Sequence, residues 1–147
     1  MLKVLIAYAT LTGNTEKMAQ YIAEGVRISG CEAVMKNISK IKEAGTLEGF
    51  SGYIFGSPTY HRDMAGNMKT FLFLAKKANL EGKLAGAFGS YTHSGDAPSI
   101  ILETMEYVYK MEPFKLGSFN LKEALIDTPE GIRACQDYGK NFGQELQ

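Results

Sequence analysis

Apolar and polar positions alternate along this chain in blocks that predict strands and helices in turn. The residues after Lys3 are apolar without interruption as far as Ala9, which is typical of a strand buried on both faces of a sheet. From Asn14 to Ser29 the apolar residues recur every three or four positions, as on one face of an amphipathic helix. Gly30 follows, where a helix commonly ends. We therefore predict a strand over Lys3–Ala9 and a helix over Asn14–Ser29.

Four later segments also have the pattern of strands. Glu32–Ile38 is half polar, which indicates a strand near the edge of a sheet. Gly52–Gly56 is short and apolar, and Lys83–Tyr91 is a longer apolar stretch that contains two internal glycines. Lys115–Leu121 alternates between polar and apolar residues and predicts an edge strand.

Three further helices are predicted between and after these strands. Helical spacing of apolar residues runs from Met64 to Ala75 and again from Ile101 to Val108. The last helix has a clear start in Thr128–Glu130, which provides a capping hydroxyl, a proline and an acidic residue in the first turn. Together these elements alternate between strand and helix to the end of the chain.

This alternation predicts an α/β fold, a doubly wound parallel sheet with helices on both faces. In such a sheet the ligand lies beyond the carboxyl ends of the strands. Three loops leave those ends with unusual chemistry, namely Thr10–Thr15, Ser57–Met64 and Ser90–Asp96. We expect them to converge on one site. Because no linker or repeat interrupts the pattern, we expect residues 1–147 to form a single domain.

Composition and charge narrow the function classes. Sixteen basic residues balance sixteen acidic ones among 147 residues, so nothing favours binding to nucleic acid or to a membrane surface. The apolar run at the N-terminus is too short for a signal peptide, and no later run is long enough to span a bilayer. We expect a cytoplasmic protein. Cys31 and Cys135 are far apart in the sequence and form no CxxC motif, and we expect both to be buried as small hydrophobic residues.

The first loop has the chemistry of an anion-binding turn. Thr10–Thr15 lies between a buried strand and the start of a helix, and it is rich in hydroxyls but contains no Lys or Arg. An anion there would be held by backbone N–H groups, by hydroxyls and by the dipole of the helix. This arrangement suits a permanently bound phosphate better than a nucleotide whose phosphate is cleaved.

Other ligand classes of the same topology fit less well. The loop contains only Gly13, so it is not the GxGxxG turn of dinucleotide-binding folds, and no P-loop motif occurs. A phospho-receiver needs carboxylates after the first and third strands, but residues 1–15 contain none and the third strand ends in Gly56–Pro58. His61 and His93 are the only histidines and have no thiolate or carboxylate at a matching spacing, so we expect no metal site.

At this point the loops resemble those of a known family. Thr10–Thr15 is similar to the flavodoxin phosphate loop T/S-x-T-G-N-T. Gly56–Tyr60, with Met64 and Asn67–Lys69 after it, resembles the flavin loop of A-type flavoproteins and flavodoxin-like quinone reductases. Gly89–Gly95 resembles the corresponding third loop of A-type flavodoxin domains. No insertion interrupts the last predicted strand, so the chain resembles a short-chain flavodoxin. This resemblance implies a five-stranded sheet of order 2-1-3-4-5 and one noncovalently bound FMN.

The resemblance also implies the residues that contact FMN. The threonines of the first loop and Ser57 would bond the phosphate, while Tyr60, Tyr91 and the two histidines would approach the flavin ring. The residues expected to bind the cofactor are Thr10, Leu11, Thr12, Gly13, Asn14 and Thr15 in the first loop, Ser57, Pro58, Thr59, Tyr60 and His61 in the second, and Ser90, Tyr91, Thr92, His93 and Gly95 in the third. Many flavodoxins flip a peptide beside a glycine next to the flavin, but Thr59–Asp63 contains no glycine. Because positive φ is costly for other residues, we expect that flip to be hindered.

The function implied is electron transfer between redox proteins, without nucleic-acid or membrane partners and without a catalytic residue of the chain's own. We expect an electron carrier and a monomer. An alternative is a flavodoxin-like NAD(P)H:quinone reductase, although such enzymes generally have extra segments that this chain lacks. A third interpretation is a redox domain of the kind that is fused to a diiron oxygen or nitric oxide reductase.

Overall fold

Five parallel strands form the central sheet of this protein, whose computed structural model describes residues 1–147. Their order is β2-β1-β3-β6-β7, which is the predicted order 2-1-3-4-5 because β6 and β7 are the fourth and fifth strands of the sheet. The strands are β1 (Lys3–Tyr8), β2 (Glu32–Asn37), β3 (Gly52–Gly56), β6 (Leu84–Tyr91) and β7 (Glu112–Lys122). The sheet order and the predicted edge positions of β2 and β7 are confirmed.

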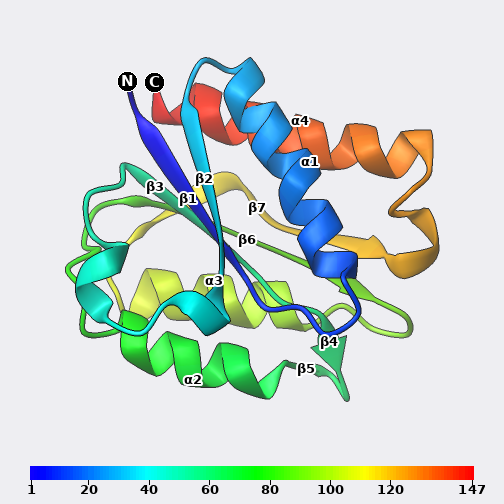
Figure 1. Cartoon of the computed structure of the whole chain (residues 1–147), viewed down its shortest axis with the longest axis horizontal. Helices are drawn as coiled ribbons and strands as arrows, with labels where there is room; N and C mark the ends of the chain where they lie inside the picture. Colours follow the sequence, from blue (N-terminus) through cyan, green and yellow to red (C-terminus); the bar gives the residue numbers. More distant parts are fainter.

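Two pairs of helices cover the two faces of the sheet (Figure 1). One face carries α1 (Asn14–Ile28) and α4 (Pro129–Leu146), and the other carries α2 (Gly66–Ala75) and α3 (Ala97–Tyr107). Short 3-10 turns complete the connections, at η1 (Ile38–Lys40), η2 (Ala44–Leu47) and η3 (Glu123–Leu125). No helix is long and apolar enough to cross a membrane.

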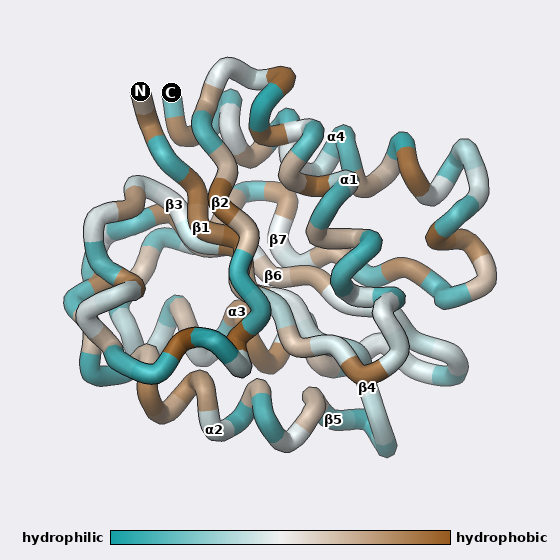
Figure 2. Tube along the Cα trace, viewed as in Figure 1, coloured by the Kyte–Doolittle hydropathy of each residue, from teal (hydrophilic) through white to brown (hydrophobic).

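Strand β1 lies in the interior of the sheet and is hydrophobic along most of its length (Figure 2). Its side chains divide between two cores. Leu5 and Ala7 belong to the core under α2 and α3, whereas Val4 and Ile6 belong to the core under α1 and α4. Successive side chains of a strand point to opposite faces. A run of consecutive apolar residues therefore fills both layers, which is why the sequence shows no alternation here.

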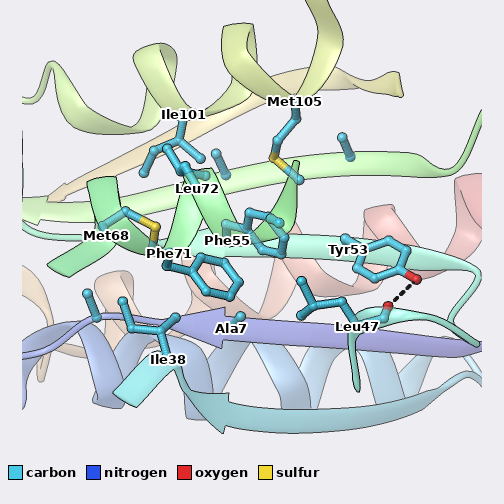
Figure 3. Packing of buried hydrophobic residues seen from close by; sticks show 14 of the residues in the cluster. Ala7, Ile38, Leu47, Tyr53, Phe55, Met68, Phe71, Leu72, Ile101 and Met105 are labelled. Atoms are coloured by element: carbon cyan, nitrogen blue, oxygen red, sulfur yellow. Dashed lines mark hydrogen bonds between the residues drawn. The ribbon is translucent and has the colours of Figure 1, made fainter. Parts of the chain in front are cut away.

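The core under α2 and α3 combines aromatic rings and methionines with alanine, leucine and isoleucine side chains (Figure 3). Phe55 and Phe71 meet edge to face with ring centroids 5.1 Å apart. The hydroxyl of Tyr53, which is fully buried, donates a 2.6 Å hydrogen bond to the carbonyl oxygen of Leu47. Burial of that ring therefore leaves no polar atom without a partner.

Helices α1 and α4 pack unusually closely because glycines lie at their crossing. A Cβ atom added to Gly139 would lie 2.0 Å from the carbonyl oxygen of Ile22, and one added to Gly25 would lie 1.9 Å from that of Gln136. Cys135 is fully buried in the same core and Cys31 nearly so, as predicted, and both are free thiols.

Three features of the fold differ from the prediction. The second loop contains an antiparallel hairpin, β4 (Thr59–Tyr60) and β5 (Asp63–Met64), that the sequence pattern does not indicate. Helix α2 begins at Gly66, so Met64, the first residue of the predicted helix, lies in β5 instead. Strand β7 begins at Glu112 rather than Lys115. Its pairing with β6 shifts register between Ala85 and Ala87. This irregular pairing lets the strand continue past Pro113 and Gly117, residues that would otherwise indicate a break.

Candidate functional site

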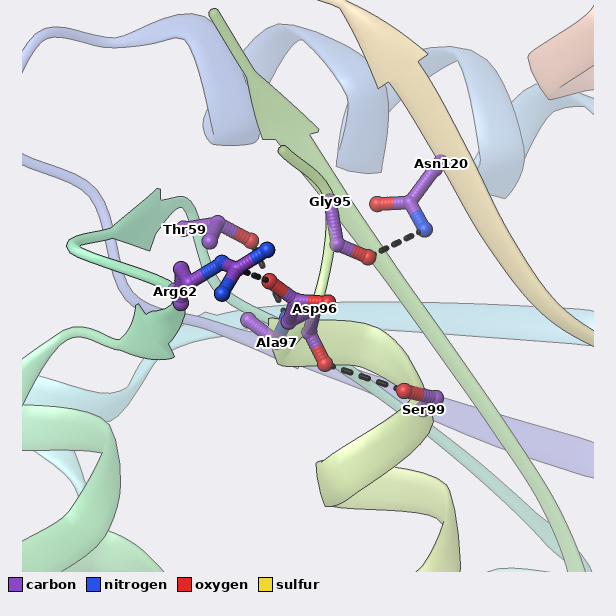
Figure 4. Close-up of polar contacts among 7 residues, drawn as sticks. All are labelled: Thr59, Arg62, Gly95, Asp96, Ala97, Ser99 and Asn120. Atoms are coloured by element: carbon purple, nitrogen blue, oxygen red, sulfur yellow. Dashed lines mark hydrogen bonds and ion pairs between the residues drawn. The ribbon is translucent and has the colours of Figure 1, made fainter. Parts of the chain in front are cut away.

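The three loops predicted to converge do meet at the carboxyl end of the sheet, so that prediction is confirmed. Thr15 and Ser90, from the first and third loops, have their hydroxyl oxygens 3.4 Å apart. Thr59, from the second loop, accepts a 3.1 Å hydrogen bond at Oγ1 from the backbone N–H of Ala97, which follows the third loop (Figure 4). Because the strands are parallel, all three loops lie at the same end of the sheet, where the contacts of Thr15, Ser90 and Thr59 connect them.

The first loop ends in a helix start that its own side chains leave largely uncapped. Gly13 precedes α1 with φ of 90°, and no side chain caps the helix. The N–H of Gly13 donates to Thr10 Oγ1 at 2.9 Å. The N–H groups of Asn14, Thr15 and Glu16 have no acceptor within the protein. Free N–H groups at the start of a helix, together with its dipole, form a site for an anion.

The hydroxyls of the first loop differ in their surroundings. Thr12 is exposed, and Thr10 is half-buried with its oxygen engaged by Gly13. Thr15 is buried against Ser90. Leu11 is 69% exposed at the outer end of the loop. An anion at the start of α1 therefore meets backbone N–H groups first, with the threonine hydroxyls at different depths around it.

Ser57 is a structural residue of the second loop in this arrangement. Its hydroxyl donates to the carbonyl oxygen of Pro58 at 2.9 Å and accepts from the N–H of Ala65 at 3.0 Å. The residue is fully buried. The backbone of Gly89 packs closely against Ser57, since a Cβ added to Gly89 would lie 2.2 Å from the Ser57 carbonyl oxygen. Its hydroxyl is thus already engaged in shaping the hairpin that follows.

The hairpin β4–β5 turns through two residues that both have positive φ. Tyr60 pairs with Asp63 across the hairpin, which leaves His61 and Arg62 as its two-residue turn with φ of 50° and 65°. Two-residue hairpins favour this geometry because it matches the twist of the strands. Positive φ is uncommon for residues other than glycine, so two such residues in succession are not expected from this sequence. The backbone already occupies the region that we expected to be costly for this loop.

A cavity of about 500 Å³ opens between the second and third loops. Its lining is mostly polar and includes aromatic and cationic side chains, and its size is in the range of small-molecule sites. The lining residues are Thr59, Tyr60, His61 and Arg62 from the hairpin and Thr92, His93 and Ser94 from the third loop. Arg62 and Ser94 were not among the predicted site residues, although their places in the same loops could have suggested them.

Tyr91 lies beside this cavity rather than in it. It is half-buried and lines a second cavity of about 470 Å³ with Thr92, Lys122 and Ala124. Thr92 lines both cavities. Tyr60, which is 38% exposed, lines the first cavity together with the imidazole rings of His61 and His93.

Gly95 and Pro58 shape the walls rather than present functional groups. The carbonyl of Gly95 accepts a 2.7 Å hydrogen bond from Asn120 Nδ2, and a Cβ at Gly95 would lie 2.6 Å from Asn120 Oδ1. The contact ties the third loop to β7 and requires a residue without a side chain. Pro58 is buried next to Ser57, whose hydroxyl it engages through its carbonyl.

Two ionisable groups near the loops have altered proton affinity. Lys69 hydrogen-bonds Asp63, and this bond, with a second from the N–H of Met64, lowers the pKa of Asp63. Burial of Tyr8 raises its pKa to about 12, aided by its 2.9 Å hydrogen bond to Glu16. The aspartate therefore remains charged and the tyrosine neutral at pH 7.

The donor set and the cavity together define the ligand chemistry. Uncharged N–H groups and hydroxyls at α1 suit a phosphate, and the neighbouring cavity between Tyr60 and His93 suits a polar ring system. No carboxylate lines the cavity. A ligand that joins a phosphate to a flat heterocycle fits this pair of features.

Comparison with known proteins agrees with this chemistry. The chain is 35% identical to a flavodoxin from Clostridium saccharobutylicum over 71% of this chain and 65% of that protein. It is 30% identical to a putative diflavin flavoprotein from Synechocystis, covering 99% of this chain but about a quarter (24%) of the relative. The solved structure of a flavodoxin from the domain Archaea superposes with a TM-score of 0.87 at 25% identity, with 99% of each chain covered.

The chain spans less than two thirds of each of these two sequence relatives. The family model for flavodoxins matches residues 6–108, a segment that contains all three loops. The sheet order and the converging loops are those of the same architecture. On sequence and fold alike, the chain belongs to the flavodoxin family.

Proposed function

We propose that this chain binds FMN noncovalently and carries electrons between redox proteins. The observation that carries the proposal is the start of α1, where backbone N–H groups without acceptors lie beside buried Thr15. Free N–H groups at a helix start suit a dianionic phosphate, and we infer that the attached ring occupies the cavity between the second and third loops. Membership of the flavodoxin family supports the same ligand.

Each loop then has a distinct part in binding. The N–H groups from Leu11 to Thr15, with the threonine hydroxyls, bind the phosphate. Tyr60 and His61 from the hairpin, and Thr92 and His93 from the third loop, contact the ring. Ser57, Pro58 and Gly95 hold those loops in shape, and Ser90 supports Thr15. Tyr91 lies next to Thr92 and supports the third loop from its outer side.

The bound flavin supplies the redox chemistry, and the protein binds it, orients it and limits its contact with water. The flavodoxins among its relatives, one by sequence and one by solved structure, support the role of an electron carrier. We therefore propose a carrier without turnover of its own substrate. Its partners are an electron donor and an electron acceptor of protein nature.

We further propose a monomer of one domain that works in the cytoplasm. Both cysteines are free thiols, as is usual for proteins of reducing compartments. Equal numbers of acidic and basic residues make association with partners only weakly dependent on salt.

A spectroscopic titration tests this function. The purified protein, stripped of any cofactor, is titrated with FMN and with riboflavin, and the visible spectrum is then followed during stepwise anaerobic reduction. Tight binding of FMN and much weaker binding of riboflavin are expected, because riboflavin lacks the phosphate that α1 would hold. Failure to bind FMN would refute the proposal.

A second assay separates a carrier from a quinone reductase. The FMN-loaded protein is mixed with NADH or NADPH and a soluble quinone, and oxidation of the nicotinamide is followed without any other protein. We expect no oxidation above the rate with free FMN. Sustained turnover that exceeds this background would instead identify a reductase.

A further inference from the structure

Two oppositely charged side chains approach each other beside the candidate cavity: Arg62, which lines it, and Asp96, which follows the lining residue Ser94 by two positions. Arg62 stands at the tip of the hairpin and Asp96 at the end of the third loop, just before α3 (Figure 4). Arg62 Nε and Asp96 Oδ2 are 4.0 Å apart. This distance permits an ion pair but exceeds that of a charge-assisted hydrogen bond, about 2.7–2.9 Å. A small inward movement of the hairpin would complete the bond.

One carboxylate oxygen of Asp96 accepts no hydrogen bond. Its side chain is 47% exposed as a whole, yet the Oδ2 atom is covered and has no hydrogen-bond partner. Aspartate at the start of a helix commonly caps the free N–H groups, but this side chain does not cap α3. A covered carboxylate oxygen without a donor is unfavourable, and Arg62 is the cation that the structure pairs with it.

The hairpin is tied to the rest of the protein at its base, and its turn lies beyond those ties. At the base, Thr59 accepts the hydrogen bond from Ala97 N–H, and Lys69 pairs with Asp63. At the tip, His61 and Arg62 both hold positive φ. Such conformations persist in residues other than glycine only where the surrounding structure fixes them. The ion pair between Arg62 and Asp96 connects this tip to the end of the third loop.

Resting on the proposed FMN-binding function, we propose that Arg62 and Asp96 form a strap that closes across the mouth of the cavity and slows release of the cofactor. Closing brings the guanidinium over the gap between the hairpin and the third loop, so the two walls separate less often. Arg62 is a positioning residue in this device, because it acts on the cofactor through Asp96 and the hairpin.

Release of FMN from the loaded protein tests the strap. Dissociation is followed by the fluorescence of freed FMN in wild type, Asp96→Asn, Arg62→Gln and the double variant. Asp96→Asn is expected to release FMN about two- to fivefold faster, the range for an exposed ion pair. The double variant is expected to release it no faster than the faster single variant, because both changes break the same contact.

Asp96→Asn separates the strap from a simple effect of charge. Removing a negative charge near a bound dianion would by itself slow release, whereas loss of the strap speeds it. Unchanged or slower release in Asp96→Asn, or effects of the two changes that multiply in the double variant, would overturn the proposal. Asp137→Asn, at an exposed position on α4, makes the same change in net charge and is expected to leave release unchanged.

A measurement on the cofactor-free protein keeps the two proposals distinguishable. The chain has arginines only at positions 27, 62 and 133, and the first and last lie within helices. An arginine-specific protease is expected to cut after Arg62 about two- to fivefold faster in Asp96→Asn than in wild type or Asp137→Asn. Equal cleavage would overturn the strap. If Asp96→Asn is cut faster than wild type but wild type binds no FMN, the proposed function is refuted instead, and with it the strap's role in cofactor release.

Discussion

The hydroxyl oxygens of Thr15 and Ser90 lie 3.4 Å apart although 75 residues separate them in the chain. Both residues are almost completely buried at the carboxyl end of the sheet. Thr15 is the first-loop hydroxyl that lies deepest beside the free N–H groups of α1, and Ser90 orients it from the third loop. The proposed phosphate site thus depends on a contact between two loops as well as on the motif of one.

Thr15→Ala is expected to weaken FMN binding at least about tenfold. A hydrogen bond to a charged group contributes about 1.5–3 kcal/mol, and about 1.4 kcal/mol corresponds to a tenfold change in affinity. Titration of the cofactor-free protein with FMN measures the effect. Thr46→Ala, which alters an exposed hydroxyl in η2, serves as the control. Equal affinity for FMN in wild type and Thr15→Ala would show that the Thr15 hydroxyl does not bind the phosphate.

Thr59→Val is expected to lower the free energy of unfolding by about 1–3 kcal/mol. The substitution keeps the shape of the side chain but leaves the buried N–H of Ala97 without its acceptor. Urea denaturation of the cofactor-free protein measures the loss. Thr70→Val removes an exposed hydroxyl from α2 and is the matched control. A loss no larger than that of the control would mean that the bond between the hairpin and α3 contributes nothing to stability.

Gly139→Ala is expected to destabilise the protein by about 1–3 kcal/mol or more, since its Cβ would lie 2.0 Å from the carbonyl oxygen of Ile22. Helices α1 and α4 would have to move apart to accept it. Gly45→Ala is the control, because no atom lies within 4 Å of the added methyl group and its φ is not positive. Thermal unfolding of both variants measures the effect. Similar melting temperatures for Gly139→Ala and Gly45→Ala would contradict the close packing of α1 against α4.

Stability is expected to fall as pH rises above about 9. Burial raises the pKa of the Cys135 thiol from 9.0 to about 12. Between these values the unfolded chain has lost this proton and the folded chain keeps it, so rising pH favours unfolding. One such group contributes a slope of up to about 1.4 kcal/mol per pH unit. Tyr8, with its pKa raised from 10.0 to about 12, adds to the loss above pH 10.

The variant Cys135→Ala isolates the thiol's share of this pH dependence. Between pH 9 and 10 its free energy of unfolding is expected to fall less steeply than that of wild type, whatever its stability at pH 7. Urea denaturation at a series of pH values gives both slopes. Parallel slopes over this interval would show that the thiol titrates alike in the folded and unfolded chains.

The sequence by itself determined the elements and the order of the sheet. The uninterrupted apolar run from Val4 to Ala9 requires a strand buried on both faces, and Thr128 begins α4 with the expected hydrogen bond from Gly131 N–H to its hydroxyl. These features follow from residues a few positions apart, whose periodicity fixes whether a segment buries one face or two. Strands and helices in alternation leave few topologies, so the meeting of the three loops could also be predicted.

Only the tertiary structure decided how those loops are shaped where they meet. Positive φ at His61 and Arg62 follows from closing a two-residue hairpin, which neither residue type indicates. The engagement of the Ser57 hydroxyl with Ala65, and the approach of Arg62 to Asp96, depend on how closely the second loop packs against its neighbours. Such contacts join residues far apart in sequence whose spacing carries no period, and a few tenths of an ångström between packed backbones determine which of them form.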